Sequence, residues 1–211
     1  YIQTSKDNAF LPEVWDVLKR IMTAYEKGTD YHIGMDSDCL IQAGADLEQL
    51  TWMDVRVGNY LPTPRHGKPV EINAYWYNDL EIMKQFALLQ QDNKLAQHYA
   101  ELADKVKEAF LLKFWNEEEN CLKDVLSGNS EENQVRCNQV WVLSMPYTML
   151  PKEKELCVLH KIKEELYTTA GLRTLSPKDS AFHDIYIGSM QERDRAYHQG
   201  TVWAFPLGAY Y

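Results

Sequence analysis

The chain has 211 residues, a formal net charge of −9 and a hydrophobic fraction of 45%. This length suits one domain, or part of a larger one, with an ordinary hydrophobic core. The negative charge argues against a nucleic-acid partner, because binding to phosphates depends on lysine and arginine. No apolar run is long enough to cross a bilayer, so no membrane partner is expected.

The first three predicted helices cover about Phe10–Lys27, Val70–Gln91 and Lys94–Phe114. Gly28 fits the position just past the end of the first helix, and Asp92 or Asn93 is expected to cap the third. The apolar residues that recur at helical spacing in the first helix are Leu11, Val14, Leu18, Ile21 and Tyr25.

Three further helices are predicted, over about Cys137–Leu150, from Pro151 to about Gly171, and from about Thr201 onward. Pro146 should kink the fourth of the six, and Pro151 suits the first turn of the fifth. The connections alternate between long and short along the chain. Antiparallel helices joined in this way place every long loop at the same end of a bundle. We therefore expect an all-α fold with its functional loops at one end, and short hairpins within loops such as "YHIGM".

The cysteines are Cys39, Cys121, Cys137 and Cys157, and their spacing fits no metal-ligand or redox motif. Four cysteines in a chain of this length do not form a disulfide framework, which favours free thiols and a cytoplasmic location. The histidines also show no ligand spacing, so neither a metal nor another cofactor is predicted. Asp36 and Asp38 match half of a calcium loop that lacks its glycine and closing glutamate, and we interpret them as a structural turn.

Three loop clusters carry most of the chemistry, and they contain "LTWMDVRVGNYLPTPRHGKPVEIN", "VRCNQVWVLSMP" and "GLRTLSPKDSAF" followed by "RDRAYHQGTVW". Each mixes amide and guanidinium groups with aromatic rings, and the first and third also contain carboxylates. Sugars are bound in this way, because aromatic faces cover their C–H patches while planar polar groups take their hydroxyls. The same residues also fit a purely structural role, since arginine–aspartate pairs on long loops commonly hold a loop in place.

Asp54 is the candidate catalytic carboxylate, since it lies beside Trp52 and Met53. An apolar neighbour raises a carboxyl pKa by desolvation, which a glycosidase general acid needs near neutral pH. The alternative is that Asp54 caps a turn or pairs with Arg56 or Arg65. No motif for serine or cysteine nucleophiles or for phosphate binding is present.

These motifs, with "TPRHGKPVEINAYWYN" and "YHQGTVW", resemble the C-terminal amylo-α-1,6-glucosidase domain of glycogen debranching enzymes along nearly the whole chain. The resemblance implies an (α/α)6 toroid, present only in part, with residues 1–211 forming an incomplete domain truncated at both ends. It implies hydrolysis of α-1,6-linked glucosyl stubs on glycogen or limit dextrin, with inversion at the anomeric carbon. The implied partners are this α-glucan and the remainder of the parent chain, with self-association of the fragment as a further expectation.

On the same resemblance, Asp54 is the general acid. The substrate-binding residues are Trp52, Arg65, Lys68, Glu71, Asn73, Arg136, Asn138, Gln139, Arg173, His198 and Gln199. The general base is expected in a segment beyond residue 211. The family pattern has glycine after Asp38, where this chain has Cys39, which argues against a tight turn at that point.

Two other interpretations remain open. One is another α/α-toroid glycosidase, glucoamylase-like or trehalase-like, which release of glucose from different substrates would distinguish. The other is a glucan-binding domain without turnover, for which saturable binding without glucose release would be the sign.

Overall fold

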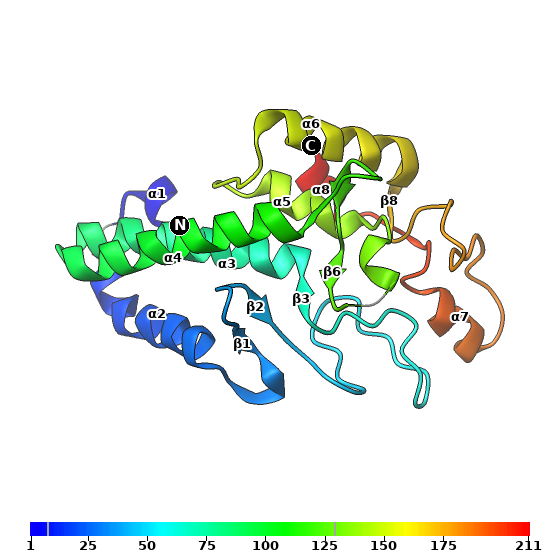
Figure 1. Ribbon diagram of the computed structural model, residues 1–211, viewed down its shortest axis with the longest axis horizontal. Helices are drawn as coiled ribbons and strands as arrows, with labels where there is room; N and C mark the ends of the chain where they lie inside the picture. Colours follow the sequence, from blue (N-terminus) through cyan, green and yellow to red (C-terminus); the bar gives the residue numbers. More distant parts are fainter. Residues whose placement is uncertain (8, 129) are drawn as a thin grey trace.

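The computed structural model describes residues 1–7, 9–128 and 130–211 and shows a helix-rich fold with several small antiparallel sheets (Figure 1). The helices are α1 Ile2–Ser5, α2 Phe10–Lys27, α3 Val70–Leu89, α4 Asn93–Lys113, α5 Val140–Ser144, α6 Lys152–Lys161, α7 Met190–Ala196 and α8 Leu207–Tyr210. The strands are β1 Gly34–Met35, β2 Ile41–Gln42, β3 Lys68–Pro69, β4 Trp115–Asn116, β5 Cys121–Leu122, β6 Val125–Leu126, β7 Tyr167–Thr168, β8 Gly171–Arg173 and β9 Val202–Trp203. Three-residue and four-residue 3-10 turns lie at Asp30–His32, Ser130–Asn133 and Cys137–Gln139, and a π turn covers Ile162–Leu166.

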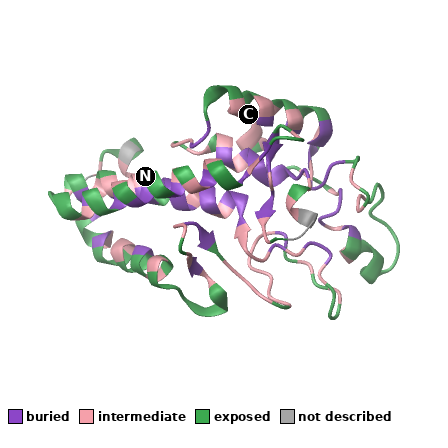
Figure 2. Cartoon of the chain, in the orientation of Figure 1, coloured by how far each residue is buried: buried purple, intermediate pink, exposed green. Residues whose placement is uncertain are grey.

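The centre of the core is the antiparallel pair α3 and α4. Both were predicted, and their ends fall within two residues of the expected ones. Asp92 caps α4 by accepting a hydrogen bond from the backbone N–H of Leu95 at 3.1 Å, which confirms one of the two expected caps. Leu80 of α3 and Val106 and Phe110 of α4 are completely buried between these and neighbouring elements. The two helices therefore form the buried centre from which the loops extend (Figure 1 and Figure 2).

Helix α2 begins and ends as predicted, but its apolar side is only partly covered. Leu11 is buried and Val14 and Leu18 are half-buried, whereas Ile21 and Tyr25 are exposed. The apolar period therefore runs partly onto the exposed side of the helix. The buried side is set instead by Leu11, Trp15 and Met22.

Short strands tie the first long loop to the rest of the chain. β1 pairs with β2, which supports the hairpin expected around "YHIGM", and β3 pairs with β6 through Lys68 and Leu126. The turn between β1 and β2 forms although Cys39 replaces the expected glycine. Cys39 takes a left-handed φ of 66° and its N–H donates to the carbonyl of Asp36 at 2.9 Å. The expectation against a tight turn is therefore wrong.

The fourth and fifth predicted helices are shorter than expected. Instead of kinking, the fourth stops at Ser144, because Pro146 offers no N–H and drives Met145 into an extended conformation. The fifth runs as α6 to Lys161 and ends in the π turn, and β7 follows it. Pro151 is the N-cap of α6 rather than part of its first turn.

The sixth predicted helix is wrong at its start, because Val202–Trp203 forms the edge strand β9 against β8. Only Leu207–Tyr210 is helical in this region. In contrast, α7 was missed, although Ser189 and Glu192 form a capping box that the spacing S-x-x-E indicates.

Figure 1 shows the segment between β2 and β3 and the segment around α7 at the same end of the α3–α4 pair. This agrees with the expected gathering of long loops at one end. Within the described residues, no helix has both the length and the apolar character needed to span a bilayer.

Candidate active site

The loop that carries Trp52 and Asp54 is anchored by a buried arginine. Arg65 is 4% exposed, its Nε donates to Oδ2 of Asp124 at 2.7 Å, and its two Nη atoms donate to the carboxylate of Glu71. Burial disfavours the charged guanidinium, but the Asp124 and Glu71 carboxylates outweigh it and raise the pKa of Arg65. Glu71 lies in the first turn of α3, and Asp124 lies just before β6, so the loop is held against both.

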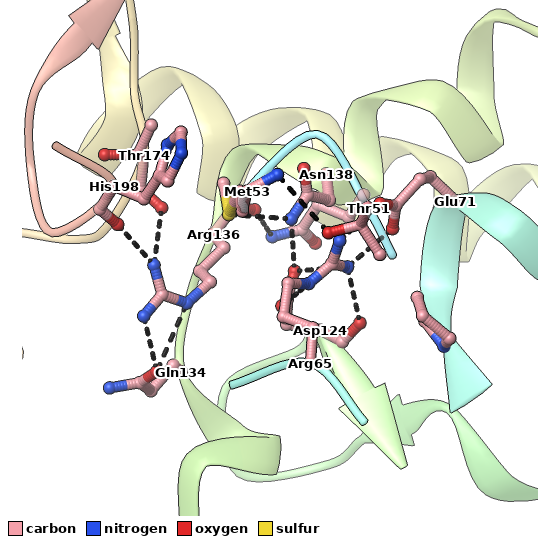
Figure 3. Close-up of polar contacts among 12 residues, drawn as sticks. Thr51, Met53, Arg65, Glu71, Asp124, Gln134, Arg136, Asn138, Thr174 and His198 are labelled. Atoms are coloured by element: carbon pink, nitrogen blue, oxygen red, sulfur yellow. Dashed lines mark hydrogen bonds and ion pairs between the residues drawn. The ribbon is translucent and has the colours of Figure 1, made fainter. Parts of the chain in front are cut away.

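The same network continues through Asn138 to Trp52. Nδ2 of Asn138 donates to Oδ1 of Asp124 at 2.7 Å and contacts the sulfur of Met53 at 3.5 Å (Figure 3). Oδ1 of Asn138 accepts from Nε1 of Trp52, also at 2.7 Å. The segment that precedes Asp54 is therefore positioned by side chains from three distant parts of the sequence.

A second buried arginine holds the C-terminal cluster in place. Nη1 of Arg136 donates to the carbonyl oxygen of His198 at 2.7 Å (Figure 3). Nη2 donates to Oε1 of Gln199 at 2.6 Å. Nε2 of Gln199 donates in turn to the carbonyl of Pro62, at 2.6 Å, so this cluster is joined to the loop of Asp54. Gly200 permits the close packing, because a Cβ there would lie 2.5 Å from the ring of Phe182.

Asp54 lies where these two networks meet. Its side chain is 64% exposed, and Oδ1 is 3.9 Å from Nε2 of His198. Within the described residues it makes no ion pair with Arg56 or Arg65, and its carboxylate accepts no hydrogen bond. The apolar enclosure expected from Trp52 and Met53 does not form, because Met53 is buried in the core while most of the Asp54 side chain is exposed.

Aromatic rings gather around Trp52, two residues before Asp54. The ring of Trp52 meets those of His198, Phe205 and Trp203 edge to face, at centroid distances of 5.1, 4.9 and 6.1 Å. Phe205 is 48% exposed, so an aromatic surface faces solvent next to the candidate acid. Such a surface suits the C–H faces of a sugar ring.

His198 is electrostatically unusual. Its side chain is 1% exposed, and neither ring nitrogen has a hydrogen-bond partner within the described residues. Burial, together with the nearby Arg136 and Arg65, lowers the pKa of His198 to about 4. The imidazole is therefore neutral at pH 7.

The other predicted site residues mostly bond to the chain itself. Lys68 binds Asp36 and Asp38 at 2.7 Å each, which agrees with the interpretation of these aspartates as part of a structural turn. The buried amides of Asn73 and Gln139 bond to backbone groups of Ile41, Pro69, Leu122 and Arg136. Arg173 is half-buried and lines a separate pocket of about 320 Å³ with Phe182 and His183.

Three residues of this region were missed in the sequence. Asp124 gives no sequence signal, because nothing local indicates that it faces Arg65. Trp203 and Phe205 alternate in "VWAF", and this period of two could have placed both rings on one face of a strand.

Within the described residues, no group of three or more histidine, cysteine or acidic side chains could hold a metal ion.

Comparison with known proteins gives a consistent class. The sequence matches the amylo-alpha-1,6-glucosidase family over residues 1–211. Mannosyl-oligosaccharide glucosidase of Saccharomyces cerevisiae is 28% identical over 130 residues, which cover 57% of this chain and 14% of the yeast protein. A solved structure titled "Sialidase" has a TM-score of 0.72 at 18% identity, covering 97% of this chain and 18% of that one. A GH78 family rhamnosidase of Bacillus sp. GL1 has a TM-score of 0.56 at 19% identity, covering 75% and 15%.

At such low identity the two solved structures show a shared fold only. The family match and the glucosidase relative place this chain in the class of glycoside hydrolase domains. Within that class, the chain belongs to the amylo-alpha-1,6-glucosidase family. It spans 14% of the length of its curated relative, so the activity of the whole protein is a matter for proposal.

Proposed function

We propose that the full-length protein removes α-1,6-linked glucosyl stubs from glycogen or limit dextrin. The observation that carries this proposal is the setting of Asp54. Its carboxyl group is exposed and free of ion pairs with arginine, and it lies beside the aromatic surface of Trp52 and Phe205 within a loop that two buried networks hold. A structural aspartate would instead be bonded to its surroundings.

In the proposed mechanism, Asp54 donates its proton to the glycosidic oxygen as the bond from that oxygen to the anomeric carbon breaks. A water molecule, activated by a second carboxylate about 6.5–9.5 Å away, adds from the opposite face and inverts the configuration. We assign that general base to no residue of this chain. It is expected beyond residue 211, in the segment that the family resemblance implies.

We also propose that these helices form part of an (α/α)6 toroid. The α3–α4 pair and the gathering of loops at one end support this architecture, since helix pairs of a toroid present their loops in this way (Figure 1). Trp52 and Arg173, which are half-buried, are proposed to contact the glucan directly. The buried Arg65, Glu71, Asn73, Arg136, Asn138, Gln139 and Gln199, and the ion-paired Lys68, would shape the pocket by holding its loops.

The test is glucose release from limit dextrin by the wild type and by Asp54→Asn. Asparagine keeps the shape but cannot donate the acid proton, so the rate should fall by roughly 10²- to 10⁴-fold. Asp46→Asn is the matched control, because Asp46 is an exposed aspartate in the same long loop, and it should release glucose like the wild type. Full activity of Asp54→Asn, with the wild type active, would contradict the proposed acid.

The substrate is tested separately from the acid. Glucose release is compared for limit dextrin, maltooligosaccharide, trehalose and a glucosylated mannosyl-oligosaccharide, the last because of the yeast relative. Preference for limit dextrin is expected. Preference for one of the others would point to a different toroid glycosidase, and saturable glucan binding without release from any of them would favour a binding domain.

A further inference from the structure

The side chains of His198 and Asp54 lie close together but differ greatly in their exposure. Oδ1 of Asp54 lies 3.9 Å from Nε2 of His198, about 1 Å beyond the usual N–H···O distance. The carboxyl side chain is 64% exposed and free of other polar contacts, whereas the imidazole is 1% exposed. A hydrogen bond between them therefore requires movement of the exposed Asp54 side chain, because the imidazole is buried.

The imidazole is fixed from several sides. Arg136 holds the backbone carbonyl of His198, and Trp52, Tyr197 and Trp203 pack against its ring at centroid distances of 5.1, 4.9 and 6.1 Å. These contacts occupy the ring faces and edges without offering a polar partner, since neither nitrogen is bonded within the described residues. A buried polar group without a partner is costly, which favours a partner supplied by the site itself.

The charged groups that face His198 are Asp54, Arg136 and Arg65. Burial, together with the two arginines, lowers the pKa of His198 and keeps the imidazole neutral at pH 7, so it has one N–H donor and one acceptor. A neutral donor does not hold Asp54 in its ionised form as strongly as an imidazolium would. It can still bond to a carboxyl oxygen and leave the acid proton on the other oxygen.

We propose that His198 is the positioning residue of the general acid: its Nε2–H donates to Oδ1 of Asp54 and turns the protonated Oδ2 toward the glycosidic oxygen. This inference rests on the function proposed for Asp54. As Oδ2–H transfers its proton, Asp54 becomes a carboxylate and the bond from His198 becomes charge-assisted. Charge-assisted hydrogen bonds are stronger than neutral ones, so His198 stabilises the transition state more than the bound substrate.

The test compares His198→Phe, which keeps an aromatic ring but has no donor, with His198→Gln, which keeps an N–H donor at similar reach. For glucose release, His198→Phe should lower kcat by roughly 10- to 100-fold, because a hydrogen bond to a charged group is lost, and leave KM within about twofold. The alkaline limb of its pH–rate profile should move to higher pH, because the carboxylate has lost a donor. His198→Gln should recover most of the rate. Equal losses in both variants, or a change confined to KM, would overturn the proposal.

The double variant distinguishes the positioning role proposed for His198 from the general-acid role proposed for Asp54. Asp54→Asn combined with His198→Phe should be no slower than Asp54→Asn alone, because His198 acts through Asp54. Multiplied losses would show that His198 acts independently and would refute the positioning role. If Asp54→Asn is inactive while His198→Phe is fully active, only this inference fails; if Asp54→Asn is fully active, the proposed function fails.

A measurement on the wild type decides the matter even if His198→Phe does not fold. Nitrogen-15 NMR of histidine-labelled protein reports which ring nitrogen carries the proton, with His198→Gln used to assign the signal. Protonation at Nε2 and not at Nδ1 is expected at pH 7. The opposite tautomer would overturn the proposal, since the nitrogen facing Asp54 would then have no proton to donate.

Discussion

At the scale of single residues, the feature that most needs compensating contacts is the buried charge of Arg65, which pairs with two carboxylates. The carboxylates of Asp124 and Glu71 and the backbone carbonyl of Asp124 accept from its guanidinium, and Nδ2 of Asn138 donates to Oδ1 of Asp124. A buried charge is tolerated only when it is paired and hydrogen-bonded, and removal of one partner leaves the other uncompensated. The network therefore couples the stability of the fold to the position of Trp52.

Asp124→Ala should lower the free energy of unfolding by about 3–5 kcal/mol, because it leaves Arg65 with an unpaired buried charge. Denaturation by urea, followed by tryptophan fluorescence, measures this. Asp104→Ala removes an exposed aspartate from α4 and should have little effect. Similar unfolding midpoints for Asp124→Ala and Asp104→Ala would show that the pair with Arg65 contributes little.

At the scale of elements, the π turn at Ile162–Leu166 connects α6 to the segment after β8 through Glu165. Its Oε1 accepts from Lys178 and Lys161 at 2.8 and 3.1 Å, and its Oε2 accepts from Ser176 at 2.6 Å. Burial favours the neutral acid, but the hydrogen bonds from Lys178, Ser176 and Lys161 outweigh it. They hold the pKa of Glu165 below its usual value of 4.5.

A depressed carboxyl pKa contributes stability above the unfolded value that is lost as the pH falls through the folded value. The difference in unfolding free energy between the wild type and Glu165→Gln should therefore be constant near neutral pH and shrink below pH 4.5. Urea unfolding at a series of pH values tests this. Glu164→Gln, at the exposed neighbouring position, should show no such trend. A difference for Glu165→Gln that does not change down to pH 3 would contradict the assignment.

At the scale of the whole molecule, α2 has exposed as well as buried positions along its length (Figure 2), and four of the exposed residues are large and apolar. Val17 and Ile21 are both 46% exposed, and Phe10 and Tyr25 are 37% and 36% exposed. These positions recur at helical spacing, so they form one continuous face rather than scattered apolar residues. Contiguous apolar surface favours association with another protein surface.

We expect a protein made of these 211 residues alone to self-associate through this face at micromolar concentrations. Ile21→Glu should weaken the association, since it places a charge in the middle of the contact. Thr23→Glu adds the same charge on the polar side of α2 and should leave association unchanged. Sedimentation velocity measures the three proteins. A wild type that is monomeric at all concentrations would contradict the role of this face.

The sequence by itself determined the elements that depend on neighbours a few residues away. The apolar period predicted α2, α3 and α4, and local caps such as Asp92 and Gly28 marked their ends. The helix prediction failed at Val202–Trp203, where a short apolar run fits both a helix and a strand. Only pairing with β8 decides that this run is a strand. The motifs also pointed to Trp52 and Asp54 as candidate site residues.

Only the tertiary structure decided which polar side chains face each other. Arg65 and Asp124 are 59 positions apart in the sequence, and Trp52 and Asn138 are 86 apart, so no local spacing reveals these pairs. The sequence also could not predict that His198 approaches Asp54 or that the Asp54 carboxyl group is exposed. Local propensity acts over one or two turns, whereas the partner of a buried charge is chosen by packing across the whole fold, which brings together groups that the sequence keeps far apart.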